Sequence, residues 1–138
     1  MYYLIILNTL ISPLLIYKNI IIYSSLSTLI LIYKKDNYHF NSFITGLLFD
    51  IITSTYILNA LIYLLMSYII NYYFKSRKYN LKNSIIIYIF IILIYNALYF
   101  IFNNTFIIHF MTNIIYIYLF NIIYLSIIFL LINNKKYS

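Results

Sequence analysis

Asp50 is the residue of this sequence with the clearest capacity for chemistry, because it is the only charged residue between positions 40 and 74. That segment is long and apolar enough to lie in a membrane, where an unpaired carboxylate costs several kilocalories per mole. An acid in such a place is a candidate functional residue by default. At helical spacing Gly46, Asp50 and Ser54 share one face. If the chain turns near residue 54, Asn59 lies across from Asp50.

Three roles for Asp50 follow from this placement. In the first, which we favour, Asp50 lies near a membrane interface and closes a helical hairpin together with Thr53, Ser54 and Asn59. In the second it relays a proton or an ion, but the sequence has no second intramembrane acid to receive the proton. In the third it contacts a partner protein. We therefore interpret Asp50 as a structural residue that is held by polar neighbours within one turn.

A second group of polar residues lies toward the C-terminus. His109, Asn113 and Asn121 fall roughly on one face of a helix, and Asn96 joins them from the preceding segment. Asn side chains hydrogen-bond across helix interfaces in membranes, so we interpret this set as an interhelical polar stripe. The other histidine, His39, lies in a polar loop, where we expect it to be solvated. Two lone histidines in separate segments are poor zinc spacing, so no metal site is predicted.

The composition excludes several kinds of active site. The chain has no cysteine, which excludes disulfides, thiolate zinc sites and a Cys nucleophile. With one glycine and one proline it cannot form a glycine-rich phosphate loop. We find no Ser/His/Asp arrangement and no paired carboxylates. We therefore predict no catalytic residues, no cofactor, no nucleic-acid partner and no enzymatic activity.

The same composition predicts an all-α integral membrane protein with a single domain, residues 1–138. Hydrophobic residues make up 65% of the chain and charged residues 8%, whereas soluble domains carry about 25% charged residues. So few charges cannot cover a water-soluble surface, and so much apolar matter excludes disorder. The abundance of Ile, Tyr, Asn and Phe indicates codons rich in A and T. Residues that resist this bias, such as Gly46 and Asp50, are therefore the most informative.

Basic loops divide the sequence into three hydrophobic blocks, each expected to form a hairpin over approximately 1–33, 42–74 and 84–133. The third block must fold back, because a helix of about 50 residues would measure about 75 Å, over twice the hydrocarbon thickness. The middle block stays open between one long tilted helix and two short ones. Short segments would need local thinning of the bilayer or partial re-entry. The predicted breaks lie at residues 17–19, 53–55 and 103–105.

The placement of charges favours hairpins in all three blocks. In that arrangement eight of the nine Lys and Arg residues lie on one face and only Lys18 lies on the other. Basic residues concentrate on the cytoplasmic side of membrane proteins, where they attract anionic lipid head groups. We therefore predict a bundle of about six transmembrane segments with both termini cytoplasmic. Residues 1–16 lack the basic start and cleavage site of a signal peptide.

One stretch of the sequence stands out from its composition. It contains Gly46-Leu47-Leu48-Phe49-Asp50, a small and polar break at Thr53-Ser54-Thr55, and an apolar run that begins with Asn59-Ala60-Leu61. This pattern, over residues 42–74, resembles the signature region of the rod shape-determining protein family MreD. The order of a membrane hairpin, this region, a basic loop, two further spans and a basic end is similar to the family plan.

The resemblance implies a function and partners. It implies a non-enzymatic scaffold subunit of the cell-elongation machinery, in the inner membrane of a rod-shaped bacterium. The partners would be an MreC-like membrane protein, the MreB-like cytoskeleton and the RodA–transpeptidase complex that polymerises peptidoglycan. We expect the partner surface where small residues allow close approach of helices. The candidates are Ser42, Gly46, Ala60 and Ser67.

The resemblance also supplies an alternative. It implies a fold similar to the substrate-binding membrane subunits of energy-coupling-factor transporters, so the chain could hold a vitamin-type ligand. Such a subunit needs a pocket lined by several polar groups from different helices, and this sequence offers few beyond Asn and Tyr. A pore-forming, holin-like protein fits the size of the chain, but it explains neither the charge pattern nor the Gly46–Asp50 stretch.

Overall fold

The computed structural model describes residues 2–12, 16–17, 20–102 and 114–134, and this part of the chain is almost entirely helical. Two strands of two residues each, β1 (Ile16–Tyr17) and β2 (Ile20–Ile21), form an antiparallel ladder between the first two helices. The predicted all-α fold is confirmed apart from this ladder. The helices are α1 (Tyr2–Ile11), α2 (Ser24–Leu31), α3 (Tyr38–Thr53), α4 (Leu58–Lys75), α5 (Leu81–Phe102) and α7 (Ile114–Asn134).

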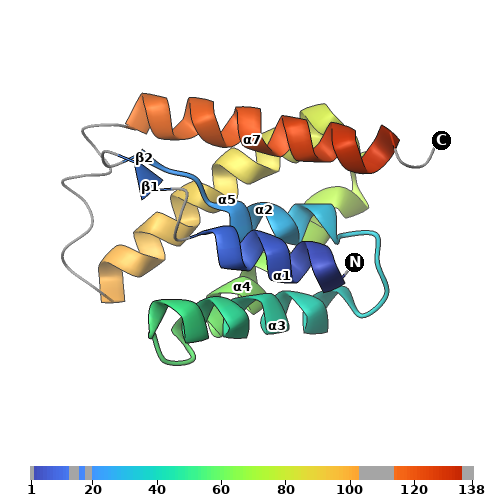
Figure 1. Ribbon diagram of the computed structural model, residues 1–138. Coiled ribbons are helices and arrows are strands. Elements are labelled where there is room, and N and C mark those ends of the chain that lie inside the picture. Colours follow the sequence, from blue (N-terminus) through green and yellow to red (C-terminus); the bar gives the residue numbers. More distant parts are fainter. Residues whose placement is uncertain (1, 13–15, 18–19, 103–113, 135–138) are drawn as a thin grey trace.

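The short helix α2 lies at the centre of the bundle (Figure 1). All eight of its residues are buried, and it packs against α1, α3, α4, α5 and α7. Half of these residues are Ser or Thr, and all four hydroxyls have partners. Ser27 and Thr28 donate to the carbonyl of Ser24 at 2.6 and 3.1 Å, whereas Ser24 and Ser25 bond to Asn8 of α1 and Tyr63 of α4. Small side chains with satisfied polar groups let the surrounding helices approach closely.

The first hairpin has shorter helices than the sequence predicts. A break at residues 17–19 implies helices that run up to it, whereas α1 ends at Ile11 and α2 begins at Ser24. The residues just before α2 keep a non-helical backbone because another helix satisfies their polar groups. The side chain of Asn121 on α7 bonds to the carbonyl of Ile21 and to the amide of Tyr23.

Two of the described helices are long and apolar enough to cross a membrane. They are the segments Leu81–Leu98 of α5 and Ile114–Asn133 of α7. The other helices are shorter or less apolar; α3, with 16 residues, measures about 24 Å. The expected bundle of six transmembrane helices is therefore confirmed only as a helical fold with two helices of spanning length. The middle block, left open by the sequence, forms two helices that are joined by a turn at residues 54–57.

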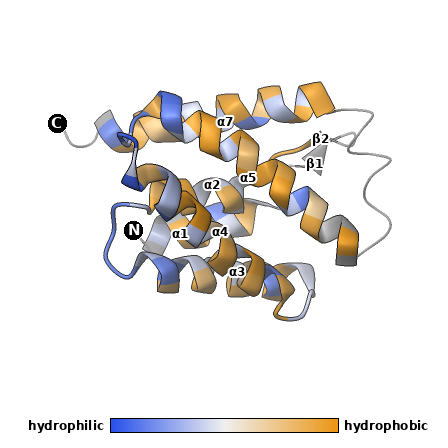
Figure 2. Ribbon diagram, turned by 180° about the vertical axis from the view of Figure 1, so that it is seen from behind, coloured by the Kyte–Doolittle hydropathy of each residue, from blue (hydrophilic) through white to orange (hydrophobic). Residues whose placement is uncertain are grey.

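Basic residues gather at one end of the bundle. Figures 1 and 2 place the α2–α3 loop, the α4–α5 loop, the start of α1 and the end of α7 at this end. The β1–β2 ladder and the α3–α4 turn lie at the opposite end (Figure 1). The described basic residues all lie in the α2–α3 and α4–α5 loops or within two residues of them: Lys34, Lys35, Lys75, Arg77, Lys78 and Lys82.

Tyr79 joins the two basic loops. Its hydroxyl donates to the carbonyl of Ile30 at the end of α2, at 2.9 Å. Its ring stacks on Tyr33 and meets Phe74 edge-on, and the ammonium of Lys34 lies 5.0 Å from the ring centroid. Burial raises the pKa of the Tyr79 phenol above its ordinary value, so the hydroxyl stays a donor. This aromatic cluster closes the basic end of the bundle.

Apolar side chains cover much of the outside of the helices. Large hydrophobic residues are exposed on α1, α4, α5 and α7, for example Tyr3, Phe90 and Ile115. The interior, by contrast, mixes apolar residues with fully buried polar ones such as Asn59 and Asn121. An unpaired polar group inside costs free energy, and both Asn59 and Asn121 are hydrogen-bonded within the chain.

Candidate functional site

The carboxylate of Asp50 lies on the last turn of α3 and bonds to the beginning of α4. Its Oδ1 atom accepts hydrogen bonds from the backbone amide of Asn59 at 3.0 Å, from the Asn59 side chain at 2.9 Å and from the Thr55 hydroxyl at 2.8 Å. Its Oδ2 atom accepts from the backbone amide of Ala60 at 2.9 Å. Only 5% of Asp50 is exposed. Both oxygens are thus occupied by one helix terminus.

This arrangement is a helix cap supplied from another helix. Asn59 and Ala60 are the second and third residues of α4, whose first amides have no partner within the helix. Ile57, at the usual capping position, makes no side-chain cap bond. Asp50 takes over that task, and its negative charge is also favoured by the positive end of the helix dipole. The cap holds α3 and α4 together as a hairpin.

In the turn between α3 and α4, the hydroxyl that contacts Asp50 is not one of the two that the sequence predicted. Ser54 adopts a left-handed conformation, with φ 54°, and ends α3, while the amide of Thr55 donates to the carbonyl of Asp50. The hydroxyl that reaches the Asp50 carboxylate belongs to Thr55, not to Ser54 or Thr53. Thr53 instead bonds to Thr55, with 2.7 Å between the two hydroxyl oxygens. Ser54 contributes backbone geometry to the site.

Gly46 is the point of closest approach between α3 and α4. A Cβ atom at this position would lie 2.5 Å from the Cα of Ala60 and 2.7 Å from the carbonyl oxygen of Asn59. Such distances would force the backbone of α4 to move, so only glycine fits. The site motif Gly46, Asp50, Asn59 and Ala60 therefore forms one continuous contact within the chain.

The predicted partner surface is consequently wrong in its location. Gly46, Ala60, Ser42 and Ser67 are all buried inside the bundle, so none is available to another protein. The expectation that His39 lies in a solvated loop is also wrong, because His39 is a residue of α3. The Nδ1 atom of His39 lies 2.7 Å from the hydroxyl oxygen of Ser67. Small residues allow close approach of helices whether the neighbour is in the same chain or in another.

The Asp50 network continues through Asn59 into the rest of the bundle. The Oδ1 atom of Asn59 accepts a hydrogen bond from the Tyr95 hydroxyl of α5 at 2.7 Å. The Tyr95 ring meets the ring of Tyr23 edge-on, and the Tyr23 hydroxyl donates to Asn96 at 2.8 Å. A buried polar path thus leads from the α3–α4 cap to α5 and to the start of α2.

Asn121 is the strongest polar junction of the predicted interhelical stripe. Its Oδ1 atom accepts from the amide of Tyr23 at 2.7 Å and from the Tyr88 hydroxyl at 2.9 Å. Its Nδ2 atom donates to the carbonyls of Ile21 and Ile117 at 2.8 and 2.7 Å. Asn121 therefore joins α7, α5 and the backbone before α2.

Asn96, the other described member of the stripe, bonds to the same segment as Asn121. Asn96 contacts Tyr23 through the phenol, whereas Asn121 contacts its backbone amide. The two residues thus meet the same segment and not each other. His109 and Asn113 lie outside the described residues.

A further polar cluster was not predicted from the sequence. The Asn8 side chain on α1 donates to the Thr28 hydroxyl at 3.2 Å and accepts from the Tyr124 hydroxyl at 2.9 Å. The carbonyl of Asn8 accepts from Ser24 at 2.8 Å. The signal was a single Asn in an apolar first segment, together with the polar run at 24–28. Neither feature identifies its partner without the tertiary structure.

These contacts make the site a structural one. The carboxylate, the amides and the phenols described above bond to one another and link α3 to α4, α4 to α5, and α7 to α1 and to the residues before α2. Among the described residues, no group of three or more His, Asp or Glu side chains is arranged to hold a metal ion. No protein-family model, no curated protein and no solved structure matches this chain.

Proposed function

We propose that this chain is an integral membrane protein whose three hairpins, α1–α2, α3–α4 and α5–α7, form six membrane segments. The apolar exterior supports this placement, because soluble proteins rarely expose large apolar patches. The gathering of the described basic residues at one end supports a cytoplasmic location for that end and for both termini. The chain would then lie in the inner membrane of a bacterium.

The internal hydrogen bonds of the first hairpin suit a membrane environment. With 10 and 8 residues, α1 and α2 measure only about 15 and 12 Å, so this hairpin would enter the bilayer without crossing it as regular helix. Non-helical backbone at membrane depth requires partners inside the protein. Asn121 and Tyr88 supply such partners to residues 21–23.

Within that placement, we propose a scaffold function in the cell-elongation machinery, of the MreD kind. The observation that carries it is that the signature residues Gly46, Asp50, Asn59 and Ala60 build one closely packed and capped hairpin. Residues that hold two helices together in this way favour a structural role over catalysis of a reaction. The partner would be an MreC-like single-span protein, with links to an MreB-like cytoskeleton and a RodA–transpeptidase complex.

The small residues Ser42, Gly46, Ala60 and Ser67 are buried inside the bundle, so we propose a different surface for the partner contact. The contact would use the exposed apolar faces of the outer helices. Residues of these faces include Ile6 and Leu10 on α1 and Leu119 and Ile123 on α7. Association there would depend on side-chain packing and on interhelical hydrogen bonds.

Cysteine labelling tests the membrane placement, because the chain has no cysteine of its own. Tyr56, in the α3–α4 turn, is 95% exposed, and Asn80, in the α4–α5 loop, is also exposed. In intact cells an impermeant maleimide should label Tyr56→Cys and should label Asn80→Cys only after lysis. Labelling of Asn80→Cys from outside would refute the proposed orientation.

Co-purification tests the scaffold function. The chain should recover an MreC-like protein from the same cell when both are solubilised in mild detergent, and should not recover an unrelated single-span protein of similar abundance. If no such partner is recovered and the purified chain instead binds a vitamin-type molecule tightly, the transporter-subunit alternative would replace the scaffold.

A further inference from the structure

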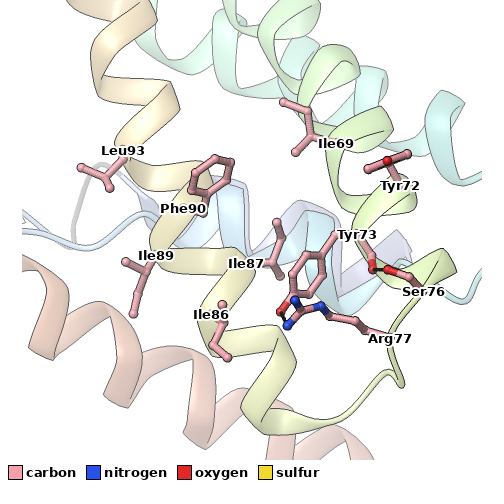
Figure 3. A pocket seen from close by; sticks show the side chains of 10 residues that line it. All are labelled: Ile69, Tyr72, Tyr73, Ser76, Arg77, Ile86, Ile87, Ile89, Phe90 and Leu93. Carbon is pink, nitrogen blue, oxygen red and sulfur yellow. Dashed lines mark hydrogen bonds between the residues drawn. The ribbon is translucent and has the colours of Figure 1, made fainter.

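An apolar groove runs between α4 and α5 and opens to the outside of the bundle at the basic end (Figure 3). Its volume is ≈ 490 Å³, within the usual range of small-molecule sites. The side chains that line it come from two helices and the beginning of their loop. On one side lie Ile69, Tyr73 and Arg77, and on the other lie Ile86, Phe90 and Leu93.

Arg77 is the only charged residue in the lining of this groove. Figure 3 shows its side chain extending from the end of α4 alongside Tyr73. The guanidinium carbon lies 4.9 Å from the centroid of the Tyr73 ring, and Nη1 donates to the Tyr73 hydroxyl at 3.5 Å. This contact positions a guanidinium that has five N–H donors and suits the geometry of phosphate.

The charges around the groove have one sign. Lys75 and Lys78 flank Arg77 in the chain, and Lys82 lies one helical turn before Ile86 on the same face of α5. Residues 75–83 contain no acid. Beyond this basic mouth, the α5 wall from Ile86 to Leu93 is apolar over about 10 Å along the helix axis. A positive mouth that continues into an apolar channel is complementary to a molecule with an anionic head and a hydrocarbon tail.

From this arrangement we infer that the α4–α5 groove binds one anionic phospholipid, with its phosphate at Arg77 and one acyl chain along Phe90 and Leu93. The site lies at the end of the bundle that we propose to be cytoplasmic, where anionic lipids are enriched. The inference rests on the membrane placement of the chain and not on the scaffold function. It differs from general attraction to a basic surface, because it requires one particular arginine and one particular groove.

Quenching of a single tryptophan tests this inference, since the chain has no tryptophan of its own. The full-length Phe90→Trp variant places the reporter in the groove. The Ile127→Trp variant places a reporter on the exposed face of α7, seven residues before the end of α7, whereas Phe90 lies nine residues after the beginning of α5. Each variant is reconstituted in phosphatidylcholine vesicles in which phosphatidylglycerol or phosphatidylcholine with dibrominated acyl chains replaces part of the lipid.

The groove reporter should show a relative binding constant for phosphatidylglycerol about fivefold to tenfold above that for phosphatidylcholine, whereas the α7 reporter should show no preference. Arg77→Gln in the Phe90→Trp background should bring the ratio close to one. Lys35→Gln, which removes a charge from the other basic loop, should leave the ratio unchanged. Arg77→Lys should keep part of the preference, because charge remains but the planar fork is lost.

Two results would overturn the inference. One is equal quenching of the groove reporter by both lipids. The other is a preference that survives Arg77→Gln or falls equally with Lys35→Gln, which would indicate a general effect of the basic surface. If brominated phosphatidylcholine quenches neither reporter, the helices do not face lipid and the membrane placement itself fails. If lipid selectivity fails while co-purification of an MreC-like partner succeeds, only the lipid site is refuted.

Discussion

The two hairpins α1–α2 and α3–α4 are closed in different ways. The α3–α4 hairpin is held by its own residues: Gly46 lets the helices meet and Asp50 caps the second helix from nine and ten residues away. The α1–α2 hairpin has bonds of its own between Asn8 and the residues Ser24 and Thr28. The backbone just before α2 also depends on α7 and α5, because Asn121 bonds to it across 98 and 100 residues of chain and Tyr88 donates to the carbonyl of Tyr23. The first is a local unit that later helices can pack upon, while the second is completed by contacts from α5 and α7.

The largest effect is expected at the closest point of the local hairpin. Gly46→Leu would place a large side chain against the backbone of Ala60 and should lower the free energy of unfolding by at least about 3 kcal/mol. Unfolding in mixed micelles, monitored by circular dichroism, measures the free energy of unfolding. Ala97→Leu on the exposed face of α5 is the matched control and should have little effect. Equal stability of the two variants would show that α4 can move aside.

The next effect concerns the hairpin that depends on distant residues. Asn121→Leu leaves the amide of Tyr23, the carbonyl of Ile21 and the Tyr88 hydroxyl without this partner, at a cost of about 2–3 kcal/mol. Hydrogen exchange should then increase first at residues 21–24, while the α3–α4 hairpin stays protected. Asn133→Leu, near the end of the same helix, serves as the control. Loss of protection in both hairpins together would contradict their independence.

A smaller effect is expected from the cap itself. Asp50→Leu removes all acceptors at the start of α4 and should cost about 2 kcal/mol, whereas Asp50→Asn keeps one oxygen and should cost about 1 kcal/mol. Unfolding of both variants and of the wild type under the same conditions measures these two losses of stability. If Asn and Leu prove equally inactive in a cell-shape assay while both variants fold and insert, the charge itself matters and the structural role is refuted.

The smallest effect tests how far the local hairpin is coupled to α5. Tyr95→Phe removes the hydroxyl that donates to Asn59 and should cost about 1 kcal/mol. The cap should survive, so exchange of the Asn59 and Ala60 amides should stay slow. Faster exchange of these amides would show that α5 helps to form the cap and that the hairpin is not a separate unit.

Much of the local hairpin was predictable from its residues. An acid, the only glycine and an Asn at suitable spacings indicated a turn with Asp50 opposite Asn59, and the structure brings these residues together. The contribution of Thr55 in place of Ser54 was not predictable, because it depends on the left-handed backbone of Ser54. The backbone angles of a turn decide which of its side chains points toward the carboxylate, and composition does not specify these angles.

The sequence by itself determined the apolar helices, the grouping of basic residues in alternate loops and the closure of the α3–α4 hairpin, because each depends on residues close together in the chain. Only the tertiary structure decided that the small residues face inward and that α2 lies at the centre. It also decided that Asn121 bonds to Tyr23 and that Asn8 bonds to Tyr124, which lie far away in sequence. Helical periodicity shows which side chains share a face, but any apolar face can pack against several others. The choice among them depends on all the helices packing at once.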